Sequence, residues 1–222
     1  MLRRMSMGIA AILVAIGAAI ATEDAPKHPI ASRPTSGQGD LPRGDVRGDS
    51  RPQASAPTST PAVPAFPHDW IGHWSGPCKS RSGDGKGMEF TMELIVGKPD
   101  AATGRGKWTI IYAGDSGRQE RPYELVVRDA AKGRYAVDEK QGIVIEMTLL
   151  DGGLYGQFTV MGNRISVSYR LEGAGKPAER LVVELVTTRV DDEVEFGGGA
   201  VPKVTSAVPV SVQRAVMTRR GR

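Results

Sequence analysis

The chain has 222 residues, and its 29 lysines and arginines against 25 acidic residues leave a net charge of +4. Residues 69–190 hold 17 basic against 16 acidic residues, interleaved without a basic stripe, which argues against a nucleic-acid-binding protein. The single cysteine, Cys78, excludes an intramolecular disulfide, so the folded part must depend on its own hydrophobic core.

Residues 1–21 have the pattern of a secretory signal peptide. Arg3 and Arg4 precede an apolar run, Met7–Ile20, and the small residues Ala19 and Ala21 stand at the −3 and −1 positions of the cleavage site. We therefore expect an exported protein, periplasmic, on the cell surface or secreted, with no membrane span once the segment is cleaved. The alternative is an uncleaved anchor, although the run is shorter than the roughly 20 apolar residues that cross a bilayer.

Residues 22–67 are predicted to form a disordered linker. They contain nine of the 15 prolines, mixed with serine, threonine, alanine and glycine. Such a segment cannot bury enough apolar surface to offset the entropy lost on ordering. Its proline content favours an extended spacer between the signal peptide and the folded domain.

The segment 68–190 alternates between apolar and polar residues with a period of two, which is typical of half-buried β-strands. Glycine-containing turns such as 151–153 and 162–163 separate the strands and favour tight antiparallel hairpins. We predict nine strands, without a helix, at residues 70–76, 88–96, 107–112, 123–127, 135–137, 143–149, 154–160, 164–171 and 181–188.

A meander of strands with one apolar face must cover that face. Since no helix is available, closure on itself satisfies both the core and the sheet edges. The sequence therefore predicts an all-β protein, an antiparallel up-and-down β-barrel of 8–9 strands. A two-sheet sandwich is the runner-up, but it requires longer crossovers than these turns allow.

Residues 191–222 break the pattern. An acidic stretch at 191–195 leads into three glycines at 197–199, and the chain then runs through valine, proline, alanine and serine to a basic end. We predict a flexible tail here, with a transient helix near residues 212–219.

The stretch 72–76, with the sequence GHWSG, resembles the first strand of lipocalins, fatty-acid-binding proteins and avidins. The resemblance is to this broad superfamily of small up-and-down barrels, which hold one hydrophobic molecule. It implies that Trp74, next to Gly72, points into the closed floor of the barrel. In lipocalins an arginine at the end of the last strand covers this tryptophan, and the matching position here is Arg189. We expect these three residues to be structural.

Apolar and tyrosine side chains dominate the inward face of the predicted strands. A buried phenol needs a hydrogen-bond partner, so inward tyrosines either bond to one another or line a cavity with a polar anchor. The barrel is thus either hollow or filled by its own side chains, and both interpretations stay open. The expected lining residues are Tyr112, Tyr123, Tyr135, Met147, Tyr169, Met92 and Phe158.

No catalytic or metal-binding constellation stands out. His73 and Cys78 are predicted to face opposite sides of one strand, and no base shares a face with Cys78. We expect no enzyme activity and no cofactor. The favoured function is an exported lipocalin-like protein that binds a small apolar or amphipathic molecule. The alternative is a filled barrel that serves as a structural or interaction module with a protein partner in the cell envelope.

Overall fold

The computed structural model describes residues 63–221. The predicted signal peptide, 1–21, and the predicted linker up to residue 62 lie outside the described residues. Strands make up most of the described part, and its helices are two single-turn 3-10 helices, η1 and η2. The bounds are η1 His68–Trp70, β1 Gly72–Ser82, β2 Gly87–Val96, β3 Arg105–Gly114, β4 Gly117–Asp129, η2 Ala130–Lys132, β5 Arg134–Asp138, β6 Val144–Leu150, β7 Gly153–Val160, β8 Asn163–Glu172, β9 Arg180–Arg189, β10 Val194–Gly198, β11 Val201–Ser206 and β12 Pro209–Arg219.

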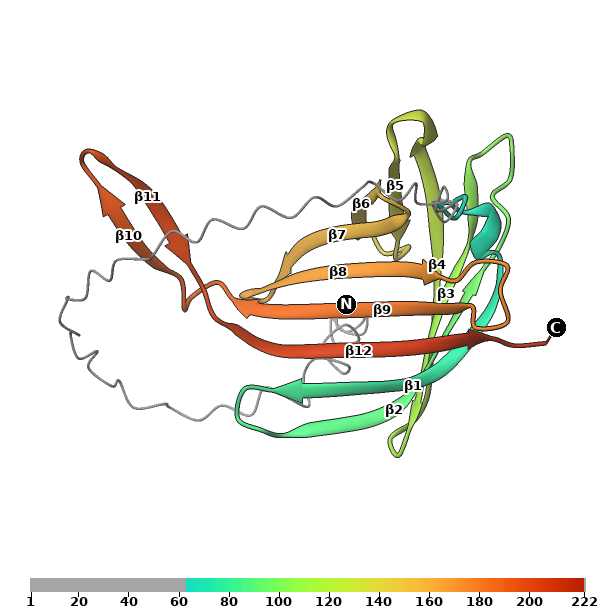
Figure 1. Ribbon diagram of the computed structural model, residues 1–222, viewed down its shortest axis with the longest axis horizontal. Helices are drawn as coiled ribbons and strands as arrows, with labels where there is room; N and C mark the ends of the chain where they lie inside the picture. The colour runs from blue at the N-terminus through green and yellow to red at the C-terminus, as the bar shows by residue number, and fades with distance from the viewer. Residues whose placement is uncertain (1–62, 222) are drawn as a thin grey trace, which may run out of the picture. The chain divides into compact units, whose positions relative to one another are not determined.

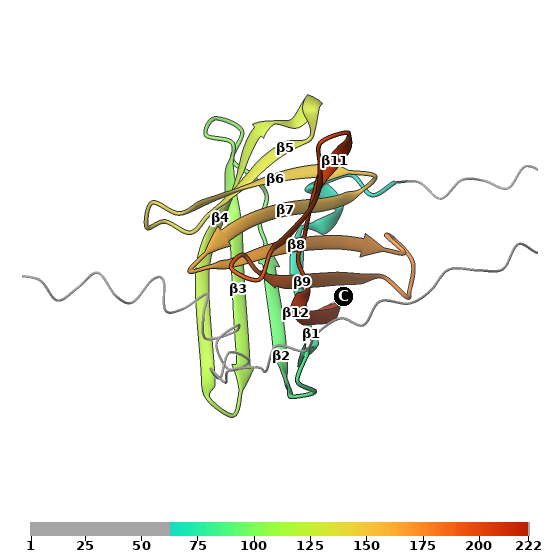
Figure 2. The same ribbon diagram turned by 90° about the vertical axis from the view of Figure 1, so that its left-hand side faces the viewer.

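Ten of these strands form a closed antiparallel barrel in the order β1-β12-β9-β8-β7-β6-β5-β4-β3-β2 (Figure 1). The predicted all-β antiparallel barrel is thus confirmed, with ten strands where eight or nine were expected. Strands from β1 to β9 each pair with the next along the chain, as an up-and-down barrel requires. Figure 2 shows β6 to β9 running across β3 and β4, so the two halves of the barrel wall cross steeply.

The prediction of a flexible tail at 191–222 is corrected by the structure. β12 pairs with β9 on one side and with β1 on the other, and so closes the barrel. Without it, both β1 and β9 would present an unpaired edge. The predicted helix near 212–219 is wrong for the same reason, because this segment is part of β12. The inward residues Gln213 and Ala215 are polar or small, which conceals the alternation in the sequence.

The remaining two strands, β10 and β11, pair only with each other. They form a hairpin that projects beyond the ends of β9 and β12 (Figure 1). The three glycines at 197–199, in the segment that the sequence suggested as flexible, all have a positive φ. Gly197 and Gly198 end β10, where the pairing register shifts, and Gly199 belongs to the turn of the hairpin.

The two ends of the barrel differ. Helix η1 precedes β1 at one end, which we call the closed end. The opposite end, called the open end, carries the β1–β2, β3–β4, β5–β6 and β7–β8 turns. Trp70, Trp74 and Trp108 are completely buried in the closed half. The Phe66 ring packs edge to face against Trp70, with ring centres 4.9 Å apart, and against Trp108, at 6.5 Å. The closed half is therefore filled by its own side chains.

Candidate functional site

Trp74 and Arg219 form the floor of the barrel. The Trp74 indole donates a hydrogen bond of 2.8 Å to the carbonyl oxygen of Trp70, the last residue of η1. On its other side, the guanidinium carbon of Arg219 lies 4.2 Å from the centre of the indole ring. A cation over an indole face contributes about 0.5–2 kcal/mol, depending on desolvation.

The same guanidinium ties three segments together. It donates to the carbonyl oxygens of Asp69, at 2.7 Å, and of Ile71. It also forms an ion pair with the buried carboxylate of Glu179, in the β8–β9 loop, at 3.1 Å. Arg219 therefore fastens η1 and this loop over the end of the barrel, which is a structural role.

The sequence assigned this role to Arg189, and the structure corrects it. Arg189 ends β9 at the open end, whereas Leu181 near the start of β9 pairs with Met217 beside the floor. Eight residues of strand separate Arg189 from Leu181, a distance of roughly 27 Å at about 3.4 Å per residue. The last strand of the barrel is β12, so the arginine that covers Trp74 comes from its end.

Gly72 lies beside the Arg219 guanidinium, where there is no space for a side chain. Its φ of +148° lies where side-chain-bearing residues are rare, and a Cβ there would lie 2.5 Å from the Arg219 guanidinium. The glycine lets the arginine reach across β1 to the carbonyl of Ile71.

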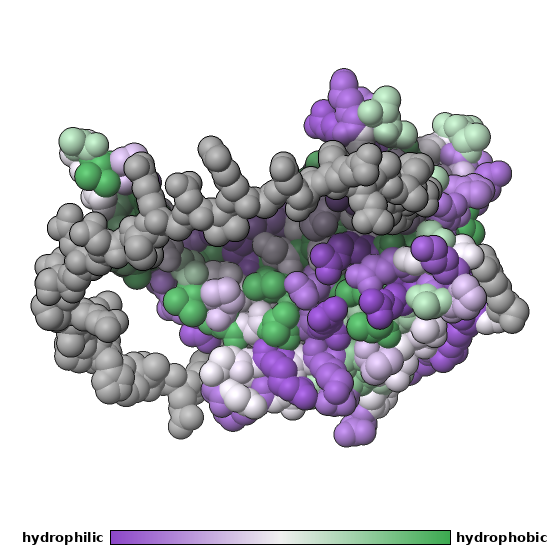
Figure 3. Space-filling model, viewed as in Figure 1, coloured by the Kyte–Doolittle hydropathy of each residue, from purple (hydrophilic) through white to green (hydrophobic). Residues whose placement is uncertain are grey.

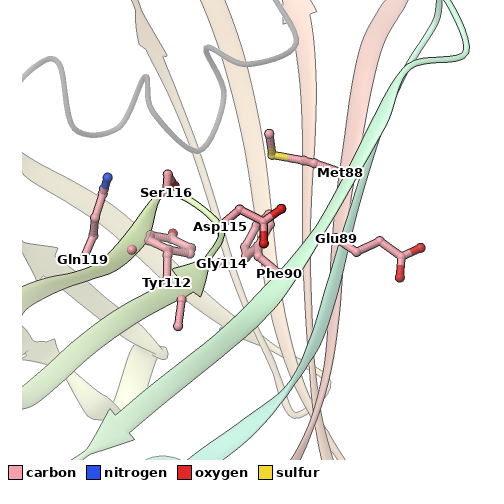
Figure 4. A pocket seen from close by; sticks show the side chains of 10 residues that line it. Met88, Glu89, Phe90, Tyr112, Gly114, Asp115, Ser116 and Gln119 are labelled. Carbon is pink, nitrogen blue, oxygen red and sulfur yellow. The ribbon is translucent and has the colours of Figure 1, made fainter.

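The open half contains a cavity of about 310 Å³ between β2, β3 and the β3–β4 turn. The Phe90 and Tyr112 rings meet edge to face there, with centres 5.8 Å apart. Met88 and Gln119 complete the inward-facing wall, while Glu89 points away from the cavity (Figure 4). We call this space the aromatic cavity.

A second cavity of about 310 Å³ lies where β4 extends beyond the short strand β5. It is lined by Arg121 and Tyr123 of β4, by Glu139 of the β5–β6 turn and by Ile143. We call it the arginine cavity. The two cavities are neighbours along β4, since Arg121 donates a 3.0 Å hydrogen bond to the Gln119 side chain, which lines the aromatic cavity.

The predicted lining residues separate into two groups. Tyr135, Met147, Tyr169 and Met92 are 1–6% exposed and belong to the packed core. Tyr169 packs its ring against Trp108, with ring centres 5.2 Å apart. Tyr112 and Tyr123 instead face the two cavities. Phe158 is partly buried and packs against the core from the open half.

Several residues of the site escaped the sequence analysis, which began the fourth strand at residue 123. In the structure β4 begins at Gly117, so Gln119 and Arg121 continue the inward face of Tyr123 and Leu125. An arginine at an inward position interrupts the alternation of apolar and polar residues. Alternation alone therefore does not extend the predicted strand from residue 123 back to Gly117. The sequence nevertheless contained an indication of these residues, because the inward positions of β4 continue at every second residue back from Leu125.

Burial shifts the ionisation of the inward groups. It raises the pKa of Tyr112, and the neighbouring Tyr169 and Tyr123 add to this. Burial and the nearby Glu139 raise the pKa of Tyr123 to about 12. Burial also raises the pKa of Glu139 to about 7, although Arg121 and a hydrogen bond with Tyr123 act in the opposite direction. The pKa of the buried Cys78 thiol rises to about 12, so the thiol is a poor nucleophile at neutral pH.

The raised pKa of Glu139 predicts a pH dependence of stability. The folded state retains a proton on this carboxyl up to about pH 7, whereas the unfolded chain loses it near pH 4.5. The folded state thus binds more protons in between, and its stability falls as the pH rises through this range. Because the carboxyl is only half-buried, we expect a loss of about 1–2 kcal/mol that Glu139→Gln abolishes. Urea unfolding at pH 5, 6, 7 and 8 measures it, and parallel curves for both proteins would contradict the assignment.

Other chemistry finds little support in the part of the chain that the structure describes. No group of three or more His, Cys, Asp or Glu side chains in residues 63–221 is arranged to hold a metal ion. His73 lies on the outer face, where it hydrogen-bonds to Glu93 at 2.8 Å, while Cys78 is buried inside. Across the same residues, no helix has the length and hydropathy needed to cross a membrane.

Comparison with known proteins yields likenesses in structure only. No protein-family model matches the sequence, and no curated protein matches it. The S-type phycobiliprotein lyase CPES from Guillardia theta aligns with a TM-score of 0.49 at 7% identity, over 70% of this chain and 90% of that one. A protein of unknown function from the DUF3598 family of Nostoc punctiforme aligns with a TM-score of 0.49 at 13% identity, over 68% and 48%.

The chain itself shows the architecture, which is a closed antiparallel β-barrel of ten strands. The antiparallel barrel is closed, a 3-10 helix precedes its first strand, and a first-strand tryptophan lies under a last-strand arginine. What the open half binds must be argued from its own residues, because the identities to the solved structures are too low to indicate a ligand.

Proposed function

We propose that this protein is an exported, lipocalin-like, non-catalytic binding protein that holds one small apolar or amphipathic molecule in the open half of its barrel. The observation that carries the proposal is the aromatic cavity. It lies above a fully packed closed half, and Met88, Phe90 and Tyr112 line it on the inner side of the wall. The signal-peptide pattern at residues 1–21 supports export.

The size and lining of the cavity indicate the class of ligand. Small-molecule sites usually measure about 300–1,000 Å³, so a space of about 310 Å³ suits a small ligand. Methionine and aromatic side chains adapt to apolar groups of varied shape. A ten-stranded wall also leaves more interior room than an eight-stranded barrel, whose side chains nearly fill it.

A fluorescence titration of the full-length protein with the neutral probe N-phenyl-1-naphthylamine tests this function. Met88→Trp fills part of the aromatic cavity with a bulky indole ring, and we expect it to weaken probe binding about tenfold or more. Glu89→Trp is the matched control, because the adjacent Glu89 points away from the cavity (Figure 4) and pairs with Lys79 and Arg81. Absence of saturable binding to the wild type, or equal loss in both variants, would refute the proposal.

A specific observation also supports the second candidate, an envelope interaction module. The β10–β11 hairpin exposes Val194, Phe196, Val201 and Val204, each more than half accessible to solvent. Figure 3 shows hydrophobic side chains on the surface of this projecting hairpin. Exposed apolar patches often mark contacts with other proteins. Crosslinking of wild-type protein in cells, compared with a Phe196→Ser variant, distinguishes this role from ligand binding.

A further inference from the structure

The outer face of the barrel carries a groove of about 470 Å³ over strands β6 to β9, which lie side by side in Figure 1. Two small residues of β8, Ser166 and Ser168, lie at its base. In the strand pairing Ser168 stands between Tyr155 of β7 and Glu184 of β9. The residues of β8 that alternate with the serines are buried inside the barrel, so the serines face outward. We call this hollow the serine groove.

The ring of Tyr155 leans along the sheet over Gly153, two residues earlier on the same face of β7. A Cβ added at Gly153 would lie 2.7 Å from both Cε2 and the phenol oxygen of Tyr155. Gly153 is buried, although it belongs to the outer face. The missing side chain at this glycine therefore gives the tyrosine ring room to lie along the strand, where it forms one wall of the serine groove.

Hydrogen-bonding groups line the rest of the groove. The side-chain amide of Gln157 donates a 2.9 Å hydrogen bond to the hydroxyl of Ser166, which links β7 to β8 at one end. Within residues 63–221 the side chains of Tyr155, Ser168 and Glu184 form no hydrogen bond or ion pair. Two hydroxyls and one carboxylate are thus available to a bound molecule.

The charge of the groove restricts what it can bind. Its charged lining residues are Glu146 and Glu184, and of the described residues that line it none is a lysine or arginine. Glu146 pairs with Arg128 at 3.2 Å, which leaves Glu184 as the carboxylate without an ion pair in residues 63–221. Like charges repel, so this lining disfavours phosphates, carboxylates and nucleic acids. A hydroxyl that donates to a carboxylate forms a short and strong hydrogen bond.

We propose that the serine groove binds a neutral saccharide chain. One face of a pyranose ring consists largely of C–H groups and packs on a tyrosine ring, while the sugar hydroxyls donate and accept hydrogen bonds. Tyr155 supplies the ring, and Ser168 and Glu184 the polar partners. Four strands at about 4.8 Å spacing make the groove about 14 Å wide, enough for more than one sugar ring. The groove lies outside the barrel wall, so this inference is independent of the proposed small-molecule cavity.

Isothermal titration calorimetry of the full-length protein with cellohexaose, maltohexaose and N-acetylchitohexaose tests the site. We expect saturable binding of at least one of these saccharides. Tyr155→Ala should weaken it about tenfold or more, whereas Tyr155→Phe, which keeps the ring, should change it less than about threefold. Glu184→Gln should weaken it several-fold, because a neutral acceptor replaces a charged one.

Glu172→Gln is the matched control, because Glu172 lies on the outer face of β8 beyond the groove and pairs with Arg180 at 2.7 Å. It should leave saccharide binding unchanged, as should an increase from about 0.05 to 0.5 M sodium chloride, since a neutral ligand is not screened. Failure of all three saccharides to bind, or equal losses in Glu172→Gln and Glu184→Gln, overturns the proposal. So does tighter binding of hexalysine, which would make the groove a cation site. Displacement of N-phenyl-1-naphthylamine by the saccharide would place the sugar inside the barrel and likewise overturn it.

Discussion

Replacing Arg219 by alanine is expected to lower the free energy of unfolding by about 3–5 kcal/mol, the usual cost of breaking a buried ion pair from one side. The arginine side chain is 15% exposed and that of Glu179 is 8% exposed, so solvent cannot replace the lost contacts. The substitution also removes the donor to the carbonyl oxygens of Asp69 and Ile71 and the cation over Trp74. Without these contacts η1 is no longer held against the closed end, and we expect it to detach from the barrel.

The matched control is Arg189→Ala. Within residues 63–221 the Arg189 side chain forms no hydrogen bond or ion pair, and it lies at the open end, where its backbone pairs with Asn163. We expect a change within about 0.5 kcal/mol, as for most surface substitutions. Urea unfolding followed by tryptophan fluorescence measures both variants, since Trp74 is buried at the floor. If Arg189→Ala were the more destabilising of the two, the placement of β12 as the closing strand would be wrong.

The second large effect is expected at Gly76, in the middle of β1. A Cβ there would overlap the carbonyl oxygen of Val216 and lie 2.8 Å from Met217 Cα, both backbone atoms of β12. Backbone atoms in a closed barrel cannot move aside as a flexible side chain does. We therefore expect Gly76→Ala to destabilise the protein by about 3 kcal/mol or more, at the upper end of overpacking effects.

Gly83→Ala provides the comparison for Gly76→Ala. A Cβ at Gly83 would have one neighbour, the Val210 carbonyl oxygen, at an ordinary contact distance of 3.7 Å. Its φ needs no glycine, so we expect little change or a small gain in stability. Thermal unfolding of the two variants and the wild type measures the change in stability that each substitution causes. A near-neutral Gly76→Ala would show that β1 and β12 do not pack as closely as the structure places them.

The asymmetry between the two ends connects stability with function. Three completely buried tryptophans and the Arg219 contacts give the closed half a packed core that can hold the wall in place. The open half then need not be filled to be stable, and it can retain the aromatic and arginine cavities. A rigid wall beside an empty space is the arrangement that a preformed small-molecule site requires.

Much of the fold could be predicted from residue alternation. Ile165, Val167, Tyr169 and Leu171 are buried in β8, as their spacing indicates, and the short glycine turns identify the hairpins. β12 could not be predicted in this way, because its inward residues include Gln213 and Ala215, which carry little apolar signal. A strand of this kind is stable only because β1 and β9 hydrogen-bond to it on both sides.

The candidate site was predictable only in part. Tyr112 and Tyr123 were expected in the interior and do face cavities, but Tyr135, Met147 and Tyr169 share their pattern and lie in the packed core. Alternation reports which side of a strand a residue faces, not how far along the barrel axis it lies. The depth of a residue depends on strand register and on which end is closed.

The sequence by itself determined that this chain forms an antiparallel up-and-down barrel whose inner face is apolar, and the resemblance of its first strand to known barrels implied that Trp74 lies at the floor. These features follow from local patterns, namely the period of two, the turn glycines and one short motif. Only the tertiary structure decided that Arg219 covers Trp74, that β12 closes the wall, and that Arg121 and Glu139 meet in one cavity. Each of these joins residues distant in sequence, and their proximity depends on barrel closure and register, which local alternation does not encode.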